Sequence, residues 1–86
     1  MNDETGVRLD QLEPHQFAVI QHIAVDDDDA QRLMSLGVCA GRTVELIKAG
    51  DPLILKVFAT RIGLSARLAS RVFAQPLPEQ SSSGGK

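Results

Sequence analysis

The sequence predicts a mainly β fold with short helices, in the form of a small antiparallel β-barrel. The chain has 86 residues, of which 43% are apolar, so one small domain with a single core is expected. Apolar residues alternate with polar ones in several short runs, which is typical of strands. Gly and Pro separate some of these runs, as turns between antiparallel strands require. The small size favours a partly closed barrel over two full sheets.

Four extended runs account for most of the predicted barrel. The first starts at Phe17, the second at Gly41 and the third at Leu53, and a closing strand covers 72–75. Gly50-Asp51-Pro52 predicts a hairpin loop between the second and third runs. The apolar residues expected to share one face are Phe17, Val19, Ile23 and Val25 in the first run, Val44 and Leu46 in the second, and Leu53, Leu55 and Val57 in the third. Ile47 lies on the opposite side of the second run, and Ile54 and Phe58 lie on the opposite side of the third.

Two short helices are expected between these runs. The four aspartates 26–29 come before one helical stripe of apolar residues, namely Ala30, Leu33, Met34 and Leu36. Carboxylates at a helix start face the positive end of the macrodipole, and Gly37 suits the left-handed position that ends a helix. Ser65 can cap a second helical turn that places Leu64 and Leu68 at i and i+4.

The packed domain is expected over residues 8–75. Residues 1–7 are mostly polar, and residues 76–86 contain two Pro, three Ser and two Gly with Leu77 as the one large apolar residue. Such segments bury too little surface to offset the entropy of ordering them. A flexible N-terminus and a disordered C-terminal tail are therefore predicted.

Composition argues against several classes of function. The longest apolar stretches have four residues, far fewer than a membrane span requires, and the acidic start Met1-Asn2-Asp3-Glu4 does not resemble a secretory signal. The net charge of −2 has the wrong sign for a protein that neutralises phosphates. Three Phe at mostly core-like positions leave no ring on which bases or a proline-rich peptide could stack. We therefore expect a cytoplasmic protein that neither inserts into a membrane nor binds nucleic acid.

The candidate chemical groups do not form a recognisable site. Counted as a calcium loop from Asp26, the chain has Gln31 at the sixth position and Gly37 at the twelfth, where Gly and Glu are needed. The aspartates therefore predict a solvated helix start, with at most loose Fe(II) or Mg(II) association. His15, His22 and Cys39 lack the spacing of a metal site or of a nucleophilic pair. The glycines are too far apart for a phosphate loop. The expectation is no enzyme, no metal site and no cofactor.

The run from Leu33 to Val44, LMSLGVCAGRTV, resembles the L-x-x-L-G-(apolar)-x-x-G-x-x-V signature of FeoA-type domains. The resemblance covers about 9–75 and includes Leu9, Leu12, Pro14, Gly50-Asp51-Pro52-Leu53, Leu55, Val57, Leu64, Ala69 and Val72. The chain departs from the family at three places. His15 stands where Gly is frequent, Ala59-Thr60-Arg61 stands where a loop Gly is common, and Ser65 stands where Arg is common.

The resemblance implies an SH3-like barrel that acts in the cytoplasm as an accessory to FeoB, the membrane transporter of ferrous iron. It implies that the chain binds the cytosolic GTP-binding domain of the transporter and tunes it, without carrying iron itself. The candidate partner-binding residues, chosen for their expected exposure, are Arg32, Ser35, Val38 and Arg61.

Two alternatives stay open at this point. One is a sensor or adaptor that responds to a divalent transition metal, because related domains are attached to iron-dependent repressors. The other concerns assembly, since unpaired strand edges could also join copies of the chain into a homo-oligomer.

The basic residues Arg61, Arg67 and Arg71 either form a solvated face or contact an acidic protein surface.

Overall fold

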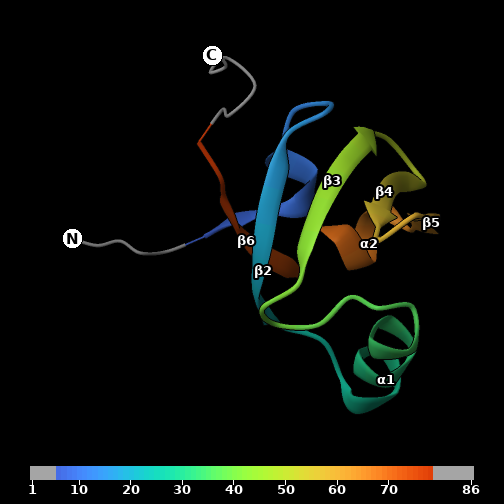
Figure 1. The fold of residues 1–86 in the computed structure, drawn as a ribbon. Coiled ribbons are helices and arrows are strands. Elements are labelled where there is room, and N and C mark those ends of the chain that lie inside the picture. The colour runs from blue at the N-terminus through green and yellow to red at the C-terminus, as the bar shows by residue number, and fades with distance from the viewer. Residues whose placement is uncertain (1–5, 79–86) are drawn as a thin grey trace.

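The computed structural model describes residues 6–78 (Figure 1). This part of the chain begins with a two-residue strand and a 3₁₀ helix. Longer strands follow, with one α-helix after the first of them and a second α-helix before the last. In chain order, the elements are β1 (Val7–Arg8), η1 (Leu9–Gln11), β2 (Phe17–Ile23), α1 (Asp27–Ser35), β3 (Thr43–Lys48), β4 (Leu53–Val57), β5 (Thr60–Leu64), α2 (Ala66–Ala69) and β6 (Val72–Pro76).

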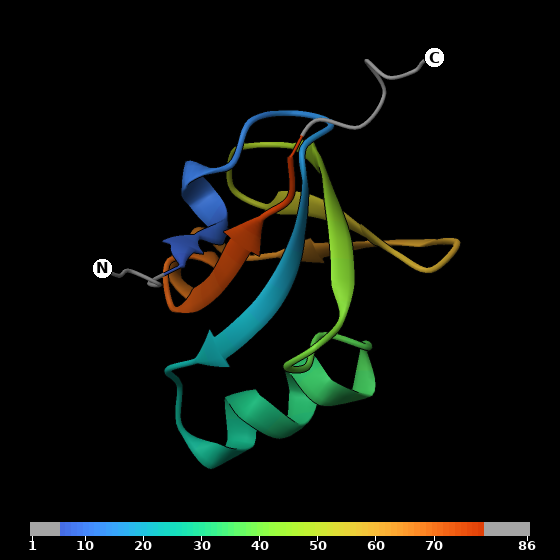
Figure 2. The same ribbon diagram turned by 60° about the vertical axis from the view of Figure 1, so that its left-hand side comes forward.

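The strands form one six-stranded antiparallel sheet in the order β1-β6-β2-β3-β4-β5. The sheet is strongly curved, and η1 and α2, which contact each other, lie on its concave side (Figures 1 and 2). β1 and β5 are its two edges. The predicted mainly β fold with short helices and antiparallel strands is confirmed.

The concave side of the sheet encloses one apolar core. Every strand from β2 to β6 contributes buried side chains, and Leu9 of η1, Leu33 of α1 and Leu68 of α2 cover them. Full burial of one such leucine stabilises the fold by ~1.5–3 kcal/mol. Among residues 6–78 no polar or charged residue is buried. The apolar core therefore decides which face of each strand points inward.

β2 buries the face opposite to the predicted one in its first half. Ala18 and Ile20 are buried, whereas Phe17 is 49% exposed. The pairing of β2 with β6 shifts register between Ile20 and His22, and a bulge of this kind changes the face that later residues take. Ile23 accordingly packs against the core. The odd-face prediction is wrong before the bulge and correct after it.

Three elements were not expected from the sequence, namely β1, η1 and β5. Leu64 belongs to β5, not to the helical turn, although Ser65 caps α2 as predicted, with its Oγ accepting a hydrogen bond from the N–H of Leu68 at 3.2 Å. In β5 the apolar residues are confined to Ile62 and Leu64, and Gly63 between them is a poor strand former. This weak pattern is the reason that the strand escaped prediction.

The paired strands extend one residue beyond each predicted domain boundary. Val7 pairs with Ala74 in the sheet, and β6 continues to Pro76. Beyond β6, the N–H of Leu77 donates a hydrogen bond to the carbonyl oxygen of Phe17 at 2.9 Å. The terminal segments predicted to be flexible fall largely on residues 1–5 and 79–86, which lie outside the described residues.

The predicted start and end of α1 are confirmed, but its predicted apolar stripe is only partly buried. Asp26 is the N-cap, and its Oδ1 accepts a hydrogen bond from the N–H of Asp29 at 2.9 Å. Gly37 follows the helix with φ of +94°. Leu33 is buried, whereas Met34 is 60% exposed and Leu36 39% exposed. The reason is that α1 lies at one end of the curved sheet instead of across its face (Figure 2).

We expect Gly37→Ala to lower the free energy of unfolding by ~1–2 kcal/mol. A residue with a Cβ is strained at a positive φ, and a Cβ on Gly37 would lie 3.0 Å from Cγ1 of Val57. Gly41→Ala is the matched control, because Gly41 has φ of +91° but nothing within 4 Å of its Cβ position. Urea unfolding of both variants measures the difference. Equal losses would show that the contact with Val57 adds no cost.

Candidate functional site

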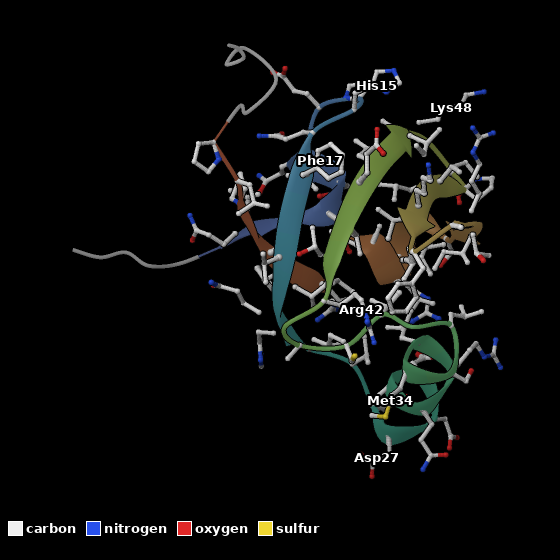
Figure 3. All side chains as sticks on the ribbon, viewed as in Figure 1. His15, Phe17, Asp27, Met34, Arg42 and Lys48 are labelled. Carbon is white, nitrogen blue, oxygen red and sulfur yellow. The ribbon has the colours of Figure 1, made fainter. Side chains whose placement is uncertain are left out.

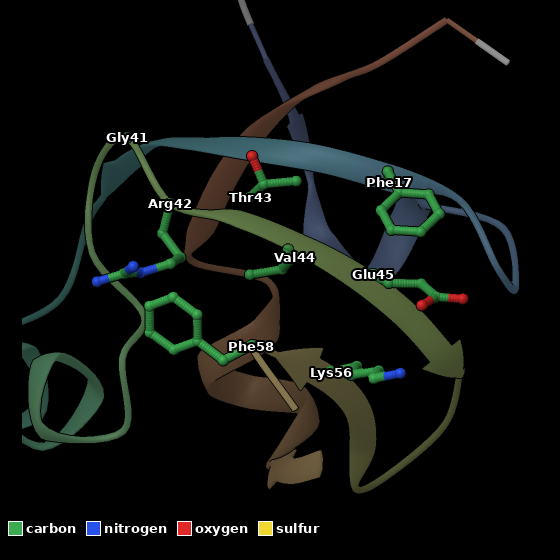
Figure 4. Close-up of a pocket in the computed structure, with 8 residues that line it drawn as sticks. All are labelled: Phe17, Gly41, Arg42, Thr43, Val44, Glu45, Lys56 and Phe58. Atoms are coloured by element: carbon green, nitrogen blue, oxygen red, sulfur yellow. The ribbon is translucent and has the colours of Figure 1, made fainter. Parts of the chain in front are cut away.

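An open groove on the outer surface of β2, β3 and β4 is the candidate functional site. It has a volume of ≈ 500 Å³. Figure 4 shows the side chains around it, which come from these strands, from the residues just before β3 and from the turn after β4. The lining residues are Phe17, Gly41, Arg42, Thr43, Val44, Glu45, Lys56 and Phe58.

Strand register places four of the exposed side chains in a line across the sheet. Phe17 of β2 pairs with Glu45 of β3, Glu45 pairs with Lys56 of β4, and Lys56 pairs with Arg61 of β5. Chain neighbours of these four residues are buried, namely Ala18, Val44, Leu46, Leu55, Val57 and Ile62, so the four side chains point outward. We call Phe17, Glu45, Lys56 and Arg61 the outer row.

Phe58 stands at the rim of the groove in a backbone conformation that usually requires glycine. Val57 pairs with Thr60, so Phe58 and Ala59 form a two-residue turn between β4 and β5. The φ of Phe58 is 59°, and a positive φ at the first central residue of such a turn favours glycine. The ring is nevertheless 72% exposed. A bulky residue in this conformation costs ~1–3 kcal/mol, and strain of this kind often accompanies function.

Arg42 holds the Phe58 ring and connects the groove to the end of α1. Its Cζ lies 4.2 Å from the ring centroid, a cation–π contact that contributes ~0.5–1 kcal/mol at an exposed site. The Nε of Arg42 donates a hydrogen bond to the carbonyl oxygen of Gly37 at 3.1 Å, and its terminal nitrogen lies 3.9 Å from Sγ of Cys39. The guanidinium is therefore fixed by partners within the chain.

The two basic residues of the outer row, Lys56 and Arg61, have no acidic partner in the part of the chain that the structure describes. Over residues 6–78, no carboxylate oxygen lies within 4.0 Å of the Lys56 or Arg61 side-chain nitrogens. Glu45, although opposite Lys56 in the register, has its Oε2 3.5 Å from Nδ1 of His15. Lys56 and Arg61 thus offer charge to solvent or to a bound partner.

Of the four residues predicted to contact a partner, one joins the outer row and one is inaccessible. The expected exposure of Val38 is wrong, because this side chain is fully buried in the core. Arg32 and Ser35 are exposed on α1, where the Ser35 Oγ donates a hydrogen bond to the carbonyl oxygen of Arg32 at 2.7 Å. Arg61 belongs to the outer row. Arg61 does not line the groove, so sequence reasoning missed all eight residues that do.

The expectation that the aromatic residues are mostly in the core is also wrong. Phe17 and Phe58 are exposed, and Phe73 is partly buried with its ring centroid 6.1 Å from that of His22. The scarcity of rings therefore does not argue against a stacking surface. What remains against nucleic acid is charge, namely the net charge of −2 and Glu45 inside the groove.

The other singled-out groups do not assemble into a metal site or a membrane segment. Within residues 6–78, no three His, Cys, Asp or Glu side chains are placed to hold a metal ion, and none of the described helices has the length and apolarity to cross a membrane. Asp29, in the first turn of α1, has its Oδ2 3.6 Å from Arg67 of α2. The acidic helix start therefore faces a basic side chain, and Arg67 is not a free cation.

The sequence model of the FeoA domain matches residues 7–76. This chain belongs to the FeoA family. The match spans all six strands of the sheet and the whole groove, and it extends the resemblance seen in the sequence by β1. The family is associated with ferrous iron transport and consists of small accessory domains, not of known enzymes.

Solved structures agree with this assignment. An iron uptake regulatory protein FeoA is 26% identical with a TM-score of 0.76, over 83% of this chain and 96% of that chain. The FeoA of Stenotrophomonas maltophilia, solved with zinc, is 33% identical with a TM-score of 0.68, over 80% of this chain and 89% of that one. That protein is described as a prokaryotic SH3-domain protein and a candidate activating factor of ferrous iron transport. The fold is thus an SH3-like barrel.

The fold also occurs within a larger protein. T. acidophilum IdeR matches with a TM-score of 0.81 over 90% of this chain but 37% of that chain, at 20% identity. Identity this low shows a shared fold and nothing more. No curated protein sequence matches the chain.

We expect Phe58→Gly to be more stable than Phe58→Ala by ~1 kcal/mol. Both variants lose the ring and its contact with Arg42, but glycine adopts the positive φ without a Cβ penalty. At an ordinary strand or helix position, alanine is the more stable of the two. Thermal unfolding of the pair measures the difference. If alanine were equal or better, the turn would not hold Phe58 under strain.

Proposed function

We propose that this chain is a small accessory and regulatory protein of ferrous iron uptake, which acts in the cytoplasm by binding the cytosolic part of a FeoB-type transporter. Membership of the FeoA family supports the link to ferrous iron transport. The open groove and the exposed Phe58 ring beside it support action by binding. The identity of the partner and the cytoplasmic location are both part of what we propose.

The observation that carries this proposal is the exposed Phe58 ring beside the groove. Phe58 is 72% exposed at a position where glycine would relieve the backbone, so neither core packing nor turn geometry accounts for a phenylalanine there. Aromatic rings that become buried on association contribute much of the affinity of protein interfaces. A ring kept at the surface at a cost in stability fits a docking residue.

We place the contact surface at the groove together with Arg61, and we include Arg32 on the neighbouring α1 as a secondary contact. Arg42 and Gly37 connect these two regions, since the hydrogen bond between them joins the groove to the loop after α1. Ser35 is a weaker candidate because its hydroxyl already bonds within the helix. Val38 is dropped because it is buried.

An accessory protein of this kind tunes its target by binding one conformation more tightly than another. A ligand shifts a conformational equilibrium only by its difference in affinity for the two states. The chain needs no chemistry of its own for this role. The metal-responsive alternative has one supporting observation, since the FeoA of Stenotrophomonas maltophilia was solved with zinc, but among residues 6–78 the structure offers it no ligand cluster.

A titration of the isotopically labelled chain with the purified cytosolic GTP-binding domain of a FeoB-type transporter tests the proposal. We expect the amide signals of the groove residues to shift, and we expect Phe58→Gly to weaken binding about tenfold or more, as removal of a buried aromatic contact does. Unchanged spectra at millimolar excess of the domain would count decisively against direct binding.

Met34→Ala is the matched control for this titration. Met34 is exposed to a similar degree but lies on α1, away from the groove (Figure 3). We expect it to leave binding unchanged. If Met34→Ala weakened binding while Phe58→Gly did not, the contact would lie on the outer side of α1 and the groove assignment would be wrong.

A further inference from the structure

We propose that the groove selects an extended partner segment in which an apolar side chain and acidic side chains lie a few residues apart. This inference rests on the proposed function, because it names the chemistry of the segment that the same surface would bind. It follows from the spacing of side chains along the outer row and from the charges that have no partner among residues 6–78.

The acidic part of the segment is assigned to Lys56 and Arg61. These residues pair directly across β4 and β5, both are exposed, and no carboxylate of residues 6–78 lies within ion-pair distance of either. Arg42 is different, since its guanidinium is already held by Gly37 and Phe58. A carboxylate placed between two adjacent cations gains from both, and hydrogen bonds between charged groups are stronger than neutral ones.

The apolar part of the segment is assigned to Phe17 and Phe58. Both rings line the groove and both are substantially exposed. Figure 4 shows them on either side of the β3 side chains, with Phe17 on β2 and Phe58 at the turn after β4. An apolar side chain inserted between them would remove ring surface from water, a gain of ~25 cal/mol per Å² buried.

The spacing along the outer row fits a short extended chain. Phe17 and Arg61 are separated by three strand-to-strand steps of ~4.8 Å each, or ~14 Å in total. An extended peptide advances ~3.3 Å per residue, so about four residues span the row from its aromatic end to its basic end. The row fixes the spacing between the apolar and the acidic side chains of the segment, which either direction of the peptide chain satisfies.

Glu45 makes a protein segment a better fit than a nucleic acid. Its carboxylate occupies the middle of the outer row beside His15, so a chain with a negative phosphate at every step would meet repulsion there. A peptide can keep its charge at one end and present a neutral or donor group to Glu45.

Two synthetic peptides of matched size test this charge preference. The probe is acetyl-Phe-Gly-Ser-Asp-Asp-amide, and its control carries Asn in place of both Asp. We expect the acidic peptide to shift the amide signals of the groove residues and to bind at least about fivefold more tightly than the control, consistent with two exposed ion pairs. Added salt should reduce the difference. Equal binding of the two peptides overturns the inference.

A double variant, Lys56→Glu with Arg61→Glu, should abolish the preference for the acidic peptide. Lys48→Glu with Arg71→Glu makes the same change of charge outside the groove, and Figure 3 places Lys48 at the opposite end of β3 from Arg42. This control pair should keep the preference. Loss of the preference in both double variants would show a response to net charge alone and would contradict the assignment to Lys56 and Arg61.

Single-stranded oligothymidylate serves as the competing probe. If it displaced the acidic peptide at lower concentration than the peptide itself requires, the groove would be a nucleic-acid surface and the inference would be wrong. If the peptide tests fail, the inference about the segment is wrong, and the titration with the transporter domain still decides the proposed function. Conversely, peptide selectivity without binding of that domain would retain the groove chemistry and refute the proposed partner.

Discussion

The antiparallel register of β2, β3 and β4 is the constraint on which both the core and the groove depend. The inward residues of these strands are apolar and buried, as with Ala18, Val44 and Leu55. Because side chains alternate between the two faces, fixing one face fixes the other. A shift by one residue would bury Glu45 and Lys56, at a prohibitive cost in desolvation. The same free energy that closes the core therefore aligns the outer row.

The sequence was sufficient for those elements in which local and tertiary signals agree. In β3 and β4 the residues predicted to share one face are the buried ones, their hairpin loop carries Gly50 and Pro52, and α1 starts with an N-cap at Asp26. β5 could not be predicted in this way, because its Gly63 weakens the pattern and its partner β4 supplies the order. The prediction of the buried face of β2 failed for another reason. The bulge of β2 changes the buried face within the strand, and nothing local to residues 17–23 marks that position.

The site was harder to predict than the fold because it is made by pairing between strands. Phe17, Glu45, Lys56 and Arg61 are far apart in the chain and come together through three registers. Phe58 was expected on the opposite side of its strand from Leu53, Leu55 and Val57, and its ring is exposed. Its role as a turn residue with positive φ depends on the Val57 to Thr60 pairing. Val38 failed as a site residue because the chain after Gly37 turns back into the core.

Net charge describes this molecule poorly, since its charges are unevenly distributed over the surface. Four aspartates gather at the start of α1, and one of them faces Arg67. Lys56 and Arg61, at the basic end of the outer row, have no such partner within residues 6–78. Exposed charges are screened beyond ~8–10 Å at physiological salt. A partner at the groove therefore responds to the nearby cations and Glu45 more than to the sum over the chain, and a slightly acidic protein can offer a locally basic surface.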